Sequence, residues 1–132
     1  MIIYKSKYWH IHLDEAKQLI TTTFNPESVD LTSEKYKEEM LIFAGLVEKF
    51  APQRLLVNSI NMAFAIDLET QEWTNTVIFP RTSSAGLTKV AIVLPPEIFI
   101  QLSLEQVMSD AVDSFTTRYF DSIAEANSWL LN

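Results

Sequence analysis

The chain has 132 residues, enough for one domain with its own core, and it contains no cysteine, which excludes disulfides, zinc–thiolate sites and thiol catalysis. Its net charge is −7, with ten basic residues scattered among seventeen acidic ones, so nucleic acid and anionic membrane surfaces are unfavourable partners. Because no stretch approaches the ~20 apolar residues of a membrane span and the N-terminus lacks the apolar run of a signal peptide, we expect a single cytoplasmic domain covering residues 1–132, without membrane insertion.

The first 24 residues predict a β-hairpin. The run "YWHIHL" alternates in character, "LITTTF" is rich in β-branched residues, and the polar "DEAK" between them has the length of a turn. His10 and His12 are two residues apart and therefore share one strand face, where a metal ion could use both. No third ligand is close to them in the sequence, so we predict no metal site.

Residues 32 to 50 predict a long amphipathic helix. Thr32 can cap its first turn, and Pro52 enforces its end. One apolar stripe follows the spacing of a helix face, formed by Tyr36, Met40, Phe43, Val47 and Phe50.

Two short apolar runs, "RLLVN" at 54–58 and "KVAIVLP" at 89–95, predict strands that are covered on both faces, as in a parallel sheet. The helix between them is expected to start at Asp67, a favourable N-cap residue. Pro80 would end or kink this helix, and Gly86 fits its terminator.

Two capping boxes predict the remaining helices. Ser103 with Gln106 predicts a helix that runs to about Val112, and Ser122 with Glu125 predicts the last one. The run "FTTRYF" between them is typical of a strand. The resulting order, β-β-α-β-α-β-α-β-α, requires right-handed crossovers. It predicts an α/β fold with a mixed, largely parallel sheet of about five strands, helices packed on it, and an N-terminal hairpin.

The order and spacing of these elements resemble the SpoIIAA-like, or STAS-like, family. The segments "AGLTKVAIVLP" and "RYFDSIAEANSWL" carry most of the likeness, which covers nearly the whole chain. The resemblance implies one stand-alone bacterial STAS-like domain, in a group whose relatives include anti-sigma-factor antagonists and the cytoplasmic domains of sulphate transporters. The family is also similar in fold to lipid-binding Sec14-type domains, which suggests an apolar ligand.

The resemblance bears on a phosphorylation switch at the start of the second helix. Antagonist-type members carry a phosphorylated serine there, after an aspartate. In this chain the helix start reads "IDLET", so Asp67 is followed by a leucine, and Ser59 lies eight residues earlier. Thr70 is the one hydroxyl close to the helix start. We therefore expect Asp67 to act as a helix cap, with a permanent negative charge as the alternative.

Candidate binding residues follow from the predicted topology, because ligands of open α/β sheets bind beyond the carboxyl ends of the parallel strands. The loops at 58–67, 95–102 and 120–122 meet this condition. We select Asn58, Ser59, Asn61, Met62, Phe64, Asp67 and Thr70. The apolar side chains of the first loop can pack into the core or be exposed to bind a partner, and the sequence leaves both open.

The favoured function is a non-enzymatic regulatory or protein-binding module that acts through the first strand–helix loop and the second helix. The alternative is a carrier of a small apolar ligand or lipid. An enzyme is least favoured, and no catalytic residue or cofactor is predicted, because the chain lacks cysteine and a "GxSxG" motif. The edge of the hairpin could also form a homodimer.

Three structural features would separate these functions. An exposed Phe64 and Met62 would favour a protein partner. An internal cavity of roughly several hundred Å³ would favour a ligand. Convergent polar groups with perturbed pKa values would favour an enzyme.

Overall fold

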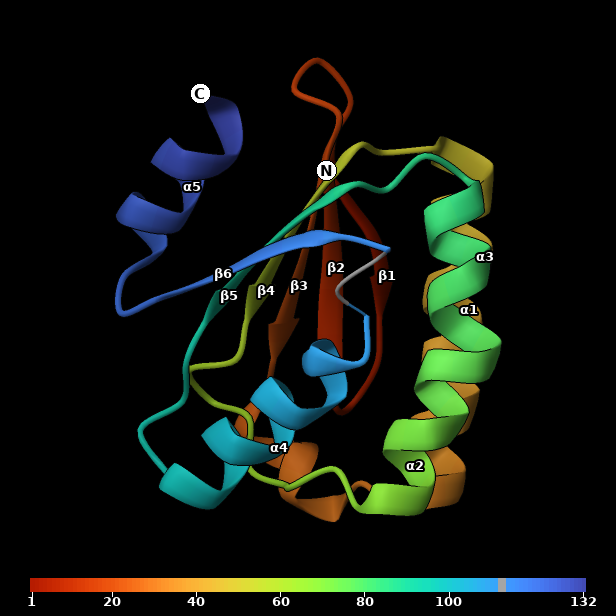
Figure 1. The fold of residues 1–132 in the computed structure, drawn as a ribbon, viewed down its shortest axis with the longest axis vertical. Helices are drawn as coiled ribbons and strands as arrows, with labels where there is room; N and C mark the ends of the chain where they lie inside the picture. Colours follow the sequence, from red (N-terminus) through yellow and green to blue (C-terminus); the bar gives the residue numbers. More distant parts are fainter. Residues whose placement is uncertain (112–113) are drawn as a thin grey trace.

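The computed structural model describes residues 1–111 and 114–132, which form an α/β fold around one six-stranded sheet (Figure 1). The strands are β1 (Ile2–Lys5), β2 (Trp9–Asp14), β3 (Leu19–Phe24), β4 (Arg54–Asn58), β5 (Lys89–Val93) and β6 (Thr116–Phe120). The helices are α1 (Ser33–Phe50), α2 (Leu68–Trp73), α3 (Phe79–Ser84), α4 (Ile98–Ser109) and α5 (Ile123–Leu131), with a short 3₁₀ helix at Pro26–Asp30 and a π-helical turn at Thr74–Ile78.

The strands lie in the sheet in the same order as in the chain. β1, β2 and β3 pair antiparallel, and β3 to β6 pair parallel. The predicted mixed, largely parallel sheet and the hairpin of β2 and β3 are therefore confirmed. β1 is a sixth strand that the sequence analysis missed, because "IIYK" shows no alternation in burial and its pairing with β2 is irregular between Ile2 and Tyr4. Because β1 pairs with β2, the outermost strand on this side of the sheet is β1, and β2 of the hairpin is not a free edge.

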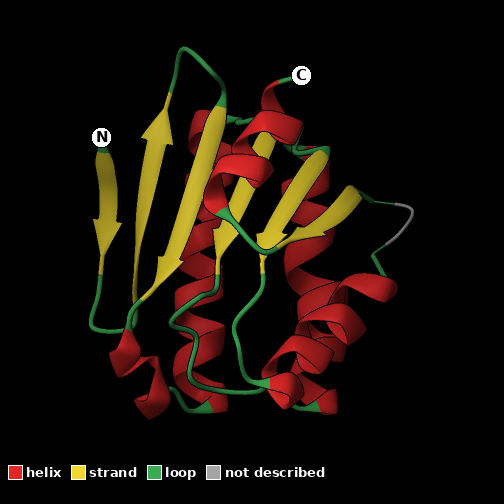
Figure 2. Ribbon diagram, turned by 90° about the vertical axis from the view of Figure 1, so that its left-hand side faces the viewer, coloured by secondary structure: helices red, strands yellow, loops and turns green. Residues whose placement is uncertain are grey.

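The helices are divided unequally between the two faces of the sheet. From β3 to β6 the strand order advances in one direction, so right-handed crossovers place α1, α2, α3 and α4 on the same face. Figure 2 shows α1, α2 and α3 behind the sheet, α4 below its right-hand strands, and α5 in front of it, where α5 packs on β4, β5 and β6. The part of this second face that β1, β2 and β3 form is not covered by any helix in the described chain.

Each face of the sheet has its own core. Consecutive residues of β4 show why "RLLVN" is apolar throughout, because Leu55 packs under the four helices and Leu56 packs under α5. The larger core joins the sheet to α1 through Phe43 and Val47, while Ala126 and Leu130 of α5 complete the smaller one. The predicted α1 stripe is confirmed as a core-facing surface.

The helical run from Leu68 to Ser84 passes through Pro80 without stopping. Pro80 has no N–H to donate to the carbonyl four residues earlier, and the π-helical turn directly before α3 widens the backbone at this point. The run ends where expected, since Gly86 has a φ of 112° that disfavours any residue with a Cβ.

The start of α4 differs from the prediction. Ser103 is not its N-cap: it is buried inside the helix, and its hydroxyl donates to the Ile100 carbonyl. The helix begins six residues earlier, with Glu97 as its N-cap, and the Glu97 carboxylate accepts from the N–H groups of Phe99 and Ile100. Glutamate is an uncommon N-cap, so the usual residue rule passes over it. The predicted end at Val112 lies outside the described residues.

Candidate functional site

Ser59 begins the loop between β4 and α2, at the carboxyl edge of the parallel strands. Its side chain is fully buried, and its hydroxyl donates to the Val93 carbonyl at 2.7 Å. The Ser59 N–H donates to the same carbonyl. Ser59 therefore joins the ends of β4 and β5 and presents no hydroxyl to solvent.

The apolar side chains of this loop mostly face inward. Met62 and Ile66 are buried in the larger core. Phe64 is half-buried, with its ring edge-on to Phe24 at 5.6 Å and to Tyr36 at 6.0 Å between centroids. Ile60, 42% exposed, is the large apolar side chain of the loop that reaches solvent. A contact surface at this loop would thus rest on Ile60 rather than on an exposed Met62 and Phe64.

Asp67 is the N-cap of α2, as predicted. One carboxylate oxygen accepts from the Thr70 N–H at 2.8 Å, and the other accepts from the Ser33 hydroxyl at 3.0 Å. These bonds lower the pKa of Asp67, the Thr70 backbone N–H most of all. Thr70 itself is buried. Asp67 therefore connects the starts of α1 and α2 while remaining negatively charged at neutral pH.

The two asparagines of the loop lie near its start. Asn58 is half-buried, and its side chain accepts from the Ile60 N–H at 3.3 Å. Asn61 is exposed, and its backbone carbonyl accepts from the Ser28 hydroxyl. The same hydroxyl accepts from the Ala63 N–H. Ser28 is a residue that the sequence analysis missed: fully buried, it fixes this loop to the 3₁₀ helix. A binding role for the seven selected residues stays a prediction.

A set of exposed apolar side chains lies at the same end of the molecule and was not selected from the sequence. They follow the carboxyl ends of β3, β4 and β5, at the lower end of Figures 1 and 2. We name this set the end surface, and it consists of Val29, Ile60, Leu68, Ile98, Phe99 and Leu102. Leu68 is 73% and Phe99 70% exposed. The predicted α4 start at Ser103 had left Ile98 and Phe99 in a connecting loop, which concealed them.

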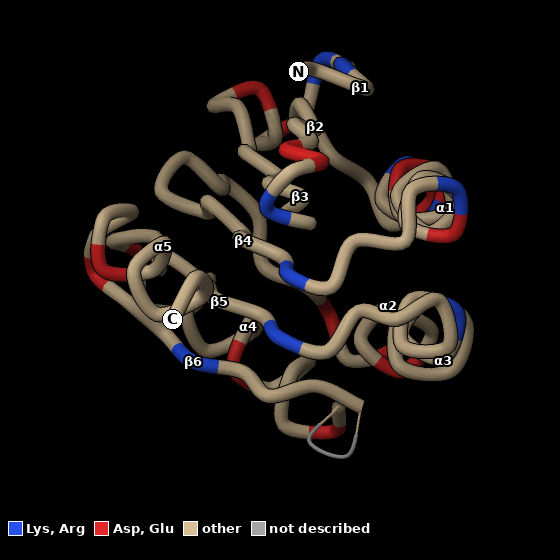
Figure 3. Tube along the Cα trace, turned by 90° about the horizontal axis from the view of Figure 1, so that it is seen from above, with Lys and Arg blue, Asp and Glu red and all other residues tan. Residues whose placement is uncertain are grey.

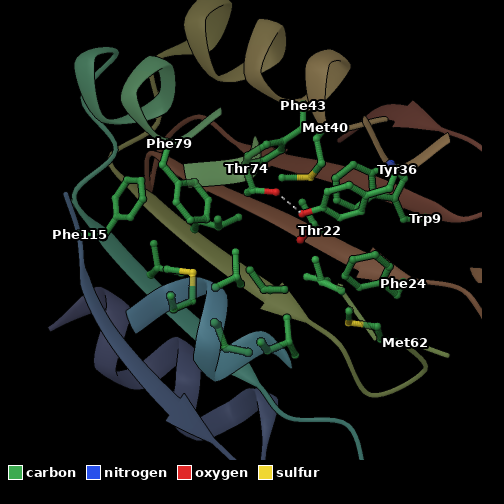
Figure 4. Close-up of a pocket in the computed structure, with 18 residues that line it drawn as sticks. Trp9, Thr22, Phe24, Tyr36, Met40, Phe43, Met62, Thr74, Phe79 and Phe115 are labelled. Atoms are coloured by element: carbon green, nitrogen blue, oxygen red, sulfur yellow. Dashed lines mark hydrogen bonds between the residues drawn. The ribbon is translucent and has the colours of Figure 1, made fainter. Parts of the chain in front are cut away.

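An apolar cavity of about 70 Å³ lies between the sheet and the helices above it (Figure 4). Its few polar groups include the Tyr36 hydroxyl and the Thr74 hydroxyl, which are hydrogen-bonded at 3.0 Å. Burial of Tyr36 raises its pKa to about 12. The cavity is smaller than the roughly several hundred Å³ of a typical ligand site.

The remaining polar candidates are engaged in structural contacts. His10 is 3.2 Å from the Asn25 side-chain oxygen, and His12 is 3.0 Å from the amino group of Met1. Within the described residues, no group of three or more His, Asp or Glu side chains could hold a metal ion. Arg81 forms a two-pronged ion pair with Glu48.

No protein family, curated protein or solved structure was found to match this chain. The resemblance to STAS-like domains therefore stays a prediction. In the part of the chain that the structure describes, no helix combines the length and apolar character needed to cross a membrane.

Proposed function

We propose that this protein is a non-enzymatic, STAS-like binding module of a bacterial cytoplasm, which docks a protein partner on the end surface. The observation that carries the proposal is the exposure of six large apolar side chains at one end of the fold. Large exposed apolar side chains that gather at one end of a domain are typical of protein interaction sites. Ile60 lies in the loop between β4 and α2 and Leu68 begins α2, while the other four residues of the end surface follow β3 and β5.

Charge defines the chemistry of the partner. The segments 25–30, 59–72 and 94–106, which carry the end surface, contain seven acidic residues and no Lys or Arg. Arg54 and Lys89, at the starts of β4 and β5, lie at the opposite end of these strands, where they donate to the last carbonyls of α5 (Figure 3). A partner that fits the end surface is therefore an apolar protein segment flanked by Lys or Arg.

The inward-facing residues of the loop between β4 and α2 hold the part of the end surface that this loop carries. Met62 and Ile66 anchor the loop in the core, and the buried hydroxyls of Ser28 and Ser59 fix its backbone. Such anchoring leaves Ile60 and Leu68 on a preorganised segment, which reduces the entropy lost on binding.

Paired variants test the proposal with a defined probe, a synthetic amphipathic helix of Leu and Lys carrying a fluorophore. We expect the double variant Leu68→Ser/Phe99→Ser to bind the peptide at least tenfold more weakly in fluorescence anisotropy. The matched control is Leu41→Ser/Ile42→Ser, which removes two exposed apolar side chains from the outer surface of α1. Equal affinity of the two double variants would contradict the proposal.

A further inference from the structure

An open groove lies on the second face of the sheet, between α5 and the strands that no described helix covers (Figure 2). Its volume is about 380 Å³, within the roughly 300–1,000 Å³ of small-molecule sites. Its lining residues come from β1 to β4 and from α5. Six of them are polar, namely His10, His12, Thr21, Thr23, Asn58 and Asn127, and three are aliphatic.

Strand pairing aligns the polar side chains of this groove. His10 pairs with Thr23, and Thr23 pairs with Asn58, so these side chains form one row across β2, β3 and β4. His12 and Thr21 form a second row on the same face, two residues away along their strands. Because neighbouring strands are ~4.8 Å apart, one small molecule can reach several of these groups at once.

The contacts of His10 define what its ring can offer to a ligand. The side-chain amide of Asn25 donates to the carbonyls of Ser6 and Lys7. The Asn25 oxygen therefore faces His10 and accepts from its Nδ1 at 3.2 Å. This bond orients the imidazole, and in the neutral ring Nε2 is left as an acceptor.

The other polar side chains add donors and further acceptors. The side-chain oxygen of Asn58 accepts from the Ile60 N–H, so its amide NH₂ group remains to donate. Thr21, Thr23 and Asn127 are half-buried, and their side chains form no hydrogen bond with another described residue. The groove thus presents a mixture of donors and acceptors that a ligand can use.

The absence of fixed charge in the lining selects the class of ligand. None of the nine described residues that line the groove is Asp, Glu, Lys or Arg, although these types make up 20% of the chain. A charged ligand would lose hydration here without gaining a charged partner. Ile2 of β1 and Ile123 of α5 also line the groove and can pack against the carbon atoms of a ligand.

We propose that this groove binds a monosaccharide, a small uncharged ring that carries several hydroxyl groups. Each ligand hydroxyl can both donate and accept, which suits a lining of imidazole, hydroxyl and amide groups. The groove shares no residue with the end surface, so this site does not depend on the docking function.

Hexoses and their uronates form matched pairs of probes, because they share a hydroxylated ring and differ in one carboxylate. The whole ¹⁵N-labelled protein is titrated with glucose, galactose and mannose and followed by NMR. We expect at least one hexose to shift the backbone amide resonances of residues 10, 21, 23 and 58 saturably. The uronate of that hexose should bind at least tenfold more weakly.

The variant Thr23→Val removes the central hydroxyl of the first row and keeps a β-branched side chain, which suits a strand. It should bind the hexose at least tenfold more weakly, whereas Thr116→Val, on the exposed edge strand β6, should bind it unchanged. Equal affinity of the two variants, or of the hexose and its uronate, would overturn the proposal. The lack of saturable shifts with all three hexoses up to ~50 mM, where millimolar binding is measurable, would also overturn it.

Discussion

At the residue scale, Asp67 shows how a candidate functional residue can carry a structural role. Its two carboxylate oxygens accept from the Thr70 N–H and from the Ser33 hydroxyl, so the side chain holds the starts of two helices together. If the charge of Asp67 mimicked a phosphoserine, it would reside on these same two carboxylate oxygens. Any test of signalling through Asp67 must therefore first account for stability.

Replacement of Asp67 by alanine should lower the free energy of unfolding by ~1 kcal/mol, because the α2 cap is lost. Asp67→Ser keeps a cap and should cost less, as measured by urea denaturation. The folded-state pKa of Asp67 is lowered, so its stabilisation is present above the unfolded pKa of ~4 and is lost as the pH falls through the folded value. The alanine variant should lack this part of the acid sensitivity. Identical unfolding curves for the alanine variant and the unmodified protein would refute the cap.

Tyr36 predicts a change in stability at high pH. Burial raises its pKa from 10.0 to about 12, so the unfolded state loses the phenolic proton first as the pH rises. Stability is therefore full below pH 10 and should fall between pH 10 and 12, by about 2 kcal/mol for this group. Tyr36→Phe should show a shallower loss over the same interval. Parallel curves for the two proteins would mean that Tyr36 ionises as freely in the folded state as in the unfolded chain.

At the element scale, the helix starts show both the reach and the limit of sequence rules. Thr32, Asp67 and Ser122 cap α1, α2 and α5, because short polar side chains at these positions accept from a backbone N–H three residues on. Glu97 performs the same task at α4 with a longer side chain. Ser103 and Gln106 have the spacing of a capping box by coincidence, because both lie inside α4.

The α4 start gives a prediction of its own. Glu97→Ala should lower the free energy of unfolding by ~1 kcal/mol, since two N–H groups of the first turn lose their acceptor. Glu105→Ala, an exposed acid on the same helix, is the control and should change stability by less than ~0.5 kcal/mol. Thermal unfolding of the two variants decides the question. Equal melting temperatures of the two variants would contradict the Glu97 cap and favour the predicted helix start at Ser103.

The strands were predictable wherever burial leaves a pattern in the sequence. β4 and β5 are apolar on both faces because helices cover both sides of them, and β2 alternates because α5 does not reach it. β1 lies at the edge with little burial, so "IIYK" carries no such pattern. The direction of Phe64 could not be predicted, because its ring packs on Phe24 and Tyr36, which are far away in the sequence.

At the scale of the whole molecule, the fold separates two kinds of surface. Strand order and right-handed crossovers bring the ends of β3, β4 and β5 to one end, together with exposed apolar and acidic residues. The other end carries Arg54 and Lys89, which hold the C-terminus of α5. This polarity is the basis of the docking proposal. A protein of net charge −7 attracts many cationic peptides, so the place of contact matters more than binding alone.

The most direct test is therefore a map of backbone amide shifts in the whole ¹⁵N-labelled protein during titration with the Leu/Lys helix. The docking account predicts that the largest shifts occur at residues 29, 60, 68 and 98–102, and that a Leu/Glu helix of the same pattern leaves the spectrum unchanged. Shifts that concentrate on the outer surface of α1, around Leu41 and Ile42, or on the open face of β1 to β3, would contradict it.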